Sequence, residues 1–262
     1  MRDAARYQAA LPGGRWVSLR DPGLKGQGWC WPGDFSYAQR FRLLPVFAGE
    51  HEAIAANLPI VFDAHALPWA VLRLAQGGAS AMVAANGVWR GSHVPEALCS
   101  YPFAQGGQGD DAGLWVDLDS GLVNPLPQGQ PFLGPDGRLT PALAQLQVRL
   151  AARARALPRL QAAADAILQS GLLQPFAQSD ALDGHFTLSR ARLDGLGRAE
   201  LARLHRSGAL ALAQAHFVSL AHIALMARAE QELAAPPAKG QSRLSAFLTA
   251  LQSDRNAPDI SY

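Results

Sequence analysis

The stretch from Leu58 to Phe103 limits the fold most strongly, because it contains three short apolar runs separated by turn-forming residues. The runs are Leu58–Phe62, Trp69–Leu74 and Ala81–Ala84. Their length and their β-branched and aromatic content predict strands rather than helices. Asn86-Gly87 follows the third run, and both residues tolerate the positive φ that a tight hairpin requires. The stretch therefore predicts antiparallel pairing, with a return strand that starts at Trp89.

The residues around this stretch predict further short elements. Val94-Pro95-Glu96 is expected to open a short helix that ends before Tyr101. A strand is predicted within Phe41–Phe47 and a short helix over Glu50–Ile54. Leu114–Leu118 is mostly apolar and short, which is typical of a half-buried strand.

The sequence becomes helical at Thr140-Pro141, because Thr is a good N-cap and Pro is favoured at the first helical position. A stripe of apolar residues follows at helical spacing: Leu143, Leu146, Leu150 and Ala154. Pro158 lacks an amide donor, so the pattern predicts a kink or break there. A second helix is then expected over Arg159–Ser170.

The C-terminal part contains the most apolar helix pattern of the chain. A strand is predicted at His185–Leu188 and a helix at Arg198–Arg206. Ala209–Leu233 carries a broad apolar stripe, which predicts the buried spine of this part. Leu244–Leu251 has the spacing of a short amphipathic helix.

Together these patterns predict an α+β fold, in which a mostly antiparallel N-terminal sheet packs against C-terminal helices. We divide the chain into a β-rich part (residues 1–139), a helical part (140–235) and a linker with a short helix and tail (236–262). We expect these parts to form one integrated domain.

Composition excludes several classes of protein. The chain has 262 residues, of which 49% are hydrophobic and 17% charged, as in globular proteins. Its net charge of +2 is too small to indicate nucleic-acid binding. We find neither a secretory signal at the N-terminus nor about 18 consecutive apolar residues. We therefore expect a soluble cytoplasmic protein without a membrane span, and its two cysteines fit that compartment.

No catalytic or cofactor motif is recognisable. The seven histidines include no pair at the i, i+4 spacing that a helical zinc site needs. A nucleophile elbow, a P-loop and a dinucleotide-binding glycine motif are also missing from the sequence. The sequence predicts no metal and no cofactor, and it identifies no catalytic residue.

One cluster of residues is a candidate binding site, at the end of the predicted hairpin and in the helix that follows. Its members are Trp89, Arg90, His93, Tyr101 and Phe103. Aromatic side chains with an arginine are typical of binding hot spots, and also of ordinary core edges, so both interpretations stay open. Glu96 and Asp117 would border the same pocket if the strands pair as expected.

The order of several short motifs resembles the bacterial SapC family. The matching segments in the central stretch are Pro59–Phe62, Ala70–Gly77, Gly87–Trp89, Pro95 and Tyr101–Phe103. Others lie upstream at Asp34–Ala38 and Leu44–Val46, and downstream at Leu204–Leu210, Ala215-His216 and Ser219-Leu220. The likeness runs from about residue 15 to about residue 230. The chain departs from the family pattern at Gly77–Ala79, His93 and Cys99-Ser100, so ligand contacts there would differ.

The resemblance implies a binding or accessory protein for a peptide or protein partner, linked to peptide transport or to processes at the cell surface. An alternative is a peptide-modifying enzyme, or a subunit of one, using residues such as His93, Tyr101 and Asp117. A second alternative is a structural component of a surface layer. The sequence leaves open whether the chain forms a homodimer.

Overall fold

The computed structural model describes residues 14–234, apart from residues 76, 78, 108–112 and 178–179. The N-terminal part forms antiparallel sheets and the C-terminal part is mainly helical, so the predicted α+β class is confirmed. The amphipathic helix predicted at Leu244–Leu251 lies outside the described residues.

The largest sheet has five strands in the order β10-β11-β4-β5-β3, and all neighbours are antiparallel. Its strands are β3 (Leu43–Pro45), β4 (Ile60–Phe62), β5 (Pro68–Val71), β10 (Leu173–Pro175) and β11 (Phe186–Leu188). Four of these strands, β3, β4, β5 and β11, lie within or overlap apolar runs predicted to be strands. The sheet thus joins strands from both ends of the chain.

Two smaller sheets complete the β-structure. One has the order β1-β7-β6 and the other β8-β2-β9. Their strands are β1 (Trp16–Ser18), β2 (Gln27–Trp29), β6 (Phe103–Gly106), β7 (Gly113–Asp117), β8 (Val123–Pro125) and β9 (Gln130–Pro131). Strand β7 confirms the strand predicted at Leu114–Leu118.

The strand predicted at Ala81–Ala84 was wrong. Only an isolated bridge forms there, between Val83 and Trp89. Ser80 forms a turn there instead, because its carbonyl accepts from the amide of Val83 and its hydroxyl from that of Met82. The turn at Asn86-Gly87 is confirmed, with Gly87 at a φ of 78°.

Short helices connect the strands. The α-helices are α2 (His51–Ala55) and α3 (Glu96–Cys99), and both were predicted. The 3₁₀ helices are η1 (Pro22–Leu24), η2 (Ser36–Arg40), η4 (Leu118–Ser120) and η5 (Asp180–Leu182).

Helix α4 (Pro141–Gln169) continues through Pro158, so of the predicted kink or break the break was wrong, and the helix predicted over Arg159–Ser170 is the second half of α4. Pro158 is exposed, whereas Leu157 and Leu160 beside it are buried in one hydrophobic cluster. A proline in a helix costs about 3 kcal/mol, and we attribute the continuity to this burial on both sides of it. Thr140 stands at the N-cap as predicted, but its side chain makes no capping bond.

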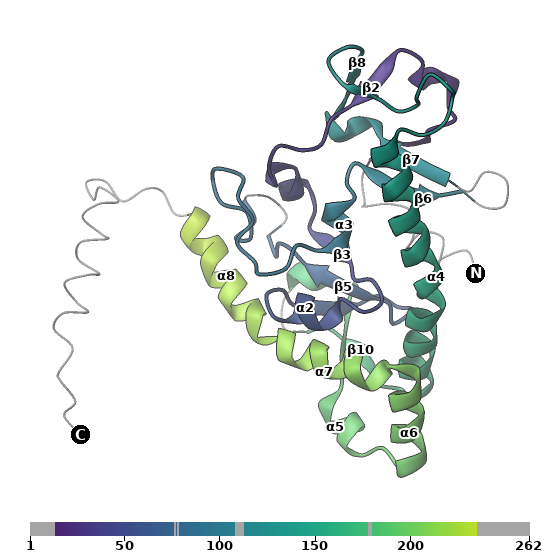
Figure 1. Ribbon diagram of the computed structural model, residues 1–262. Coiled ribbons are helices and arrows are strands. Elements are labelled where there is room, and N and C mark those ends of the chain that lie inside the picture. Colours follow the sequence, from purple (N-terminus) through teal and green to yellow (C-terminus); the bar gives the residue numbers. More distant parts are fainter. Residues whose placement is uncertain (1–13, 76, 78, 108–112, 178–179, 235–262) are drawn as a thin grey trace, which may run out of the picture.

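Helix α4 also connects two of the hydrophobic clusters. Its first half contributes Leu143, Leu146 and Leu150 to a cluster with the β1-β7-β6 sheet. Its second half packs with the C-terminal helices. Figure 1 shows α4 running from β6 and β7 down to α6.

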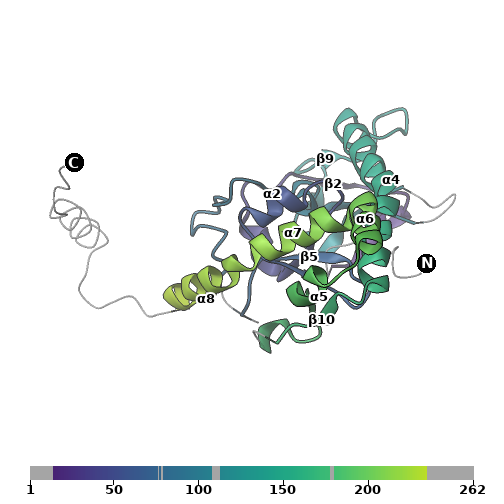
Figure 2. The ribbon, with the colours of Figure 1, turned by 90° about the horizontal axis from the view of Figure 1, so that it is seen from below.

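Four helices follow β11: α5 (Arg190–Asp194), α6 (Arg198–Ser207), α7 (Ala209–Ser219) and α8 (Ala221–Ala234). The buried spine predicted for Ala209–Leu233 is correct for α7, which packs against α2 and β4. It is wrong for most of α8, where Leu225 is 62% exposed. Figure 2 shows α8 extending away from the body, so only one of its sides finds a partner surface.

The run Ala209–Ala234 is long and apolar enough to cross a membrane by length and composition, which alone is weak evidence. The expectation of a protein without a membrane span stays a prediction. The core helix of a soluble protein meets the same criterion, and 39% of this apolar window is buried inside the protein.

His216 of α7 connects β4 and β11 inside the protein. Its Nδ1 lies 2.7 Å from the carbonyl oxygen of Ile60, and its Nε2 accepts from the amide of Leu188 at 3.1 Å. The hydroxyl of Thr187 lies 2.8 Å from the same Nε2. Strands β4 and β11 share only one residue pair, so His216 bonds backbone groups that the sheet does not pair. Burial lowers the pKa of His216 to about 4, which keeps the ring neutral.

Candidate functional site

An open groove of about 520 Å³ lies between the loop and helix at residues 47–53 and the middle of α4. This volume is within the range of about 300–1,000 Å³ that small-molecule sites occupy. Its apolar lining consists of Phe47, Ala48, Ala53, Ala152 and Ala156. Its charged and titratable lining consists of Glu50, His93, Glu96, Arg149 and Arg153.

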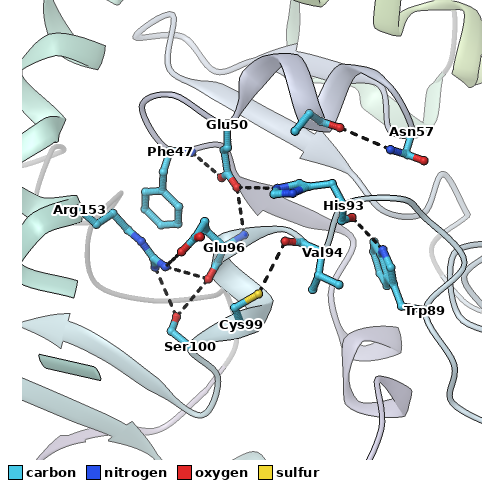
Figure 3. A network of polar contacts seen from close by, with 11 residues as sticks. Phe47, Glu50, Asn57, Trp89, His93, Val94, Glu96, Cys99, Ser100 and Arg153 are labelled. Atoms are coloured by element: carbon cyan, nitrogen blue, oxygen red, sulfur yellow. Dashed lines mark hydrogen bonds and ion pairs between the residues drawn. The ribbon is translucent and has the colours of Figure 1, made fainter. Parts of the chain in front are cut away.

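Glu50 is the buried centre of a polar network at this groove. Its carboxylate accepts from the amide of Phe47 at 2.7 Å and from the amide of Glu96 at 3.0 Å. His93 Nε2 lies 3.3 Å from the same carboxylate. Burial raises the pKa of Glu50, while these hydrogen bonds act in the opposite direction. Glu50 thereby fixes the loop before α2 to the start of α3 (Figure 3).

Arg153 forms the second half of the network. Its guanidinium is 2.7 Å from the carboxylate of Glu96 and 2.9 Å from the Glu96 carbonyl oxygen. The same group lies 3.4 Å from the hydroxyl of Ser100 and 4.1 Å from the centre of the Phe47 ring. Three elements, α3, α4 and the loop before α2, therefore meet at one side chain (Figure 3).

A narrow cleft lies behind Phe47 and Arg153, which line both spaces. Its volume of about 30 Å³ has room for about two water molecules, since one needs about 10–15 Å³. Two of its lining residues carry buried polar atoms without a partner in the described structure, Trp16 Nε1 and Gln105 Oε1. Ordered water would satisfy them, and of these two adjoining spaces the outer groove is the one with room for a larger ligand.

Of the seven predicted site residues, His93 and Glu96 lie in the groove. Trp89 is buried, and its indole nitrogen donates to the His93 carbonyl oxygen at 2.8 Å. This bond helps to hold the backbone of His93 in place. Arg90 is exposed and bonds the carbonyl oxygen of Ala81, outside the groove lining.

Tyr101 and Asp117 form a separate buried pair. The Tyr101 hydroxyl donates to the Asp117 carboxylate at 2.8 Å and accepts from Arg40 at 2.9 Å. Each of the two paired residues is 1% exposed. Burial and, secondarily, the bond to Asp117 raise the pKa of Tyr101. The pair joins the start of β6 to the end of β7, and neither residue lines the groove.

Phe103 belongs to the aromatic core. Its ring packs edge-on against Trp29, with ring centres 5.0 Å apart, and it lines the narrow cleft. It is 1% exposed, so it contributes packing. Six of the seven predicted residues therefore divide among the groove, its support and the core, and Arg90 lies at the surface outside the groove.

The other lining residues were not predicted from the sequence, and the aromatic and charged ones among them are Phe47, Glu50, Arg149 and Arg153. The spacing along the helix could have identified Arg153. It lies three positions after the buried Leu150 and four before the buried Leu157, which places it on the same face of α4 as these two residues. Nothing local marks Glu50, because its partner amide at Glu96 is 46 residues away.

Neither a metal-ligand cluster nor a disulfide is present in the part of the chain that the structure describes. No group of three or more His, Cys, Asp or Glu residues there could hold a metal ion. Cys30 is half-buried and Cys99 exposed, and both are free thiols.

The chain is therefore an α+β protein in which the polar network of Glu50 and Arg153 lies beside an open, alanine-lined groove. The chain belongs to the SapC family, whose model matches residues 29–226. The resemblance seen in the sequence is thereby confirmed over most of the chain. No curated protein and no solved structure matches the chain.

Proposed function

We propose that this SapC family member is a binding or accessory protein that holds a peptide segment of a partner in the groove between α2 and α4. The observation that carries the proposal is the groove itself, with its mixed apolar and charged lining and its volume of about 520 Å³. Recognition sites for flexible ligands typically combine an apolar surface with a few fixed polar groups.

The polar network of Glu50 and Arg153 supports this proposal, because its hydrogen bonds connect the walls of the groove to each other without a ligand. Glu50 accepts from the amides of Phe47, three residues away, and Glu96, 46 residues away, and Arg153 donates to Glu96 across 57 residues. A preformed site loses less conformational entropy on binding than a flexible one. We further propose, from the family name, that the partner takes part in peptide transport or in processes at the cell surface.

The alternative of a peptide-modifying enzyme would use His93, Tyr101 and Asp117 together. His93 lines the groove, whereas Tyr101 and Asp117 are buried and bonded to each other. This separation favours binding over catalysis by these three residues. No specific observation favours a structural role in a surface layer.

The test is affinity capture from source cells with the full-length protein and two variants, followed by mass spectrometry. Ala152→Trp fills the groove, and Ala144→Trp is the matched control at an exposed position of α4 outside it. We expect a peptide or protein to be retained by the wild type and by Ala144→Trp, and to be lost with Ala152→Trp. Equal recovery with both variants would refute binding in the groove.

A further inference from the structure

Arg149 is an uncommitted positive charge at the groove. It is exposed on α4, one turn before Arg153. Among the residues that the structure describes, it has no hydrogen-bond or ion-pair partner, whereas Arg153 is bonded to Glu96. An arginine side chain presents five donors in a planar fork that matches a carboxylate.

The acidic groups of the groove are already engaged. The carboxylate of Glu50 is 6% exposed and accepts from two amides. The carboxylate of Glu96 is paired with Arg153 at 2.7 Å. The guanidinium of Arg149 is therefore the unpaired charge that a ligand would meet in the groove. It favours a ligand that carries a negatively charged group.

The apolar part of the groove identifies a second property of the ligand. Ala53 of α2 and Ala152 and Ala156 of α4 present only methyl groups to it, and Phe47 adds an aromatic ring. Small side chains leave room for a bulky side chain on the ligand. Burying such a group contributes about 25 cal/mol for each Å² of apolar surface removed from water.

We infer that the groove recognises a peptide through a carboxylate paired with Arg149 and a bulky apolar side chain packed against Ala152 and Ala156. This inference rests on the proposed function and specifies the class of its ligand. The carboxylate has two sources, the C-terminus of the peptide or an Asp or Glu side chain.

The test uses three unlabelled, N-acetylated peptides and the whole chain in 50 mM salt, and isothermal titration calorimetry measures their binding. The first probe is Gly-Gly-Ala-Leu-Phe with a free C-terminus, and the second is the same peptide as its amide. The third is Gly-Gly-Phe-Glu-Gly amide, whose only carboxylate is internal. We expect at least one carboxylate peptide to bind about five times more tightly than the Leu-Phe amide, the gain of about 1 kcal/mol that a partly exposed charge pair provides.

Charge reversal separates Arg149 from the general charge of the helix. Arg149→Glu is expected to weaken binding of the carboxylate peptide about tenfold. Arg155→Glu makes the same charge change at an exposed position of α4 outside the groove, and it should leave binding unchanged. Circular dichroism establishes that both variants are folded.

Each further outcome has a defined meaning. If all three peptides bind equally and Ala152→Trp abolishes binding, the carboxylate inference is refuted and peptide binding in the groove stands. If Ala152→Trp leaves peptide binding unchanged, both proposals fail. If no peptide binds, or if Arg149→Glu and Arg155→Glu weaken binding equally, the inference is likewise overturned. When the carboxylate inference holds, the tighter of the two carboxylate peptides identifies the source of the carboxylate.

Discussion

The guanidinium of Arg153 lies 4.1 Å from the centre of the Phe47 ring, with α4 on one side and the loop before α2 on the other. The same guanidinium is ion-paired with Glu96. The wall of the groove therefore depends on one long side chain that reaches across from α4. This dependence leads to the first prediction.

Replacing Arg153 with Met should lower the free energy of unfolding by about 1–2 kcal/mol, because charge-assisted hydrogen bonds and the contact with Phe47 are lost. Arg155→Met is the control, since Arg155 is exposed on the same helix, and it should change stability by less than about 0.5 kcal/mol. Urea unfolding followed by circular dichroism measures both. Equal effects of the two substitutions would contradict the role given to Arg153.

Glu50→Ala should destabilise the protein by about 2 kcal/mol, because the amides of Phe47 and Glu96 lose their buried acceptor. It should also weaken capture of the partner, since the loop that forms one wall of the groove loses its anchor. Glu52→Ala, an exposed position two residues further on, is the matched control with an expected effect below about 0.5 kcal/mol. If Glu50→Ala were as stable as Glu52→Ala, the buried carboxylate would not stabilise the loop before α2 or the start of α3.

His216 predicts a loss of stability in acid. Its folded pKa of about 4 is below the ordinary value of 6.5, so the unfolded chain binds the extra proton first as the pH falls. The stabilisation is complete above pH 6.5 and is lost between pH 6.5 and pH 4, by about 3 kcal/mol.

The measurement for this prediction is the free energy of unfolding from pH 4 to pH 7.5, for the wild type and for His216→Leu. The variant should be less stable at pH 7.5, because Ile60 and Leu188 lose a buried partner. The difference between the two proteins should narrow as the pH falls. A constant difference over this range would mean that His216 does not titrate as described.

Pro158→Ala should stabilise the protein by about 1–3 kcal/mol. Pro158 is exposed inside α4, and alanine restores the missing amide donor without removing a buried contact. Val148→Ala is the control, because Val148 is 67% exposed on the same helix and should have little effect. Thermal unfolding measures the stability of both variants. A lower stability of the Pro158→Ala protein would contradict the prediction, because the proline would then stabilise α4.

Local patterns predicted the elements well where one local force dominates. The apolar runs at β4 and β5, the turn at Gly87 and the start of α4 at Thr140-Pro141 all follow from neighbouring residues. The errors arose where buried contacts or a polar side chain override the local apolar pattern. Burial of Leu157 and Leu160 carries α4 through Pro158, and Ser80 turns the chain where an apolar run favoured a strand.

The candidate site was less predictable for the same reason. His93 and Glu96 were identified because they are close in sequence to the predicted hairpin. Glu50 and Arg153 join them through contacts that span 43 to 57 residues, and no local pattern carries such information. Tyr101 and Phe103 illustrate the reverse error, since aromatic residues near a site can belong to the core beside it.

The unbroken α4 also has a mechanical consequence. Its 29 residues extend about 44 Å at 1.5 Å per residue, and its two halves belong to two different hydrophobic clusters. The groove lies beside the middle of this rod, at Arg149–Ala156, where the two clusters meet. A partner that tilts α4 on binding would move the β1-β7-β6 sheet and the C-terminal helices in opposite directions, as the two ends of a lever.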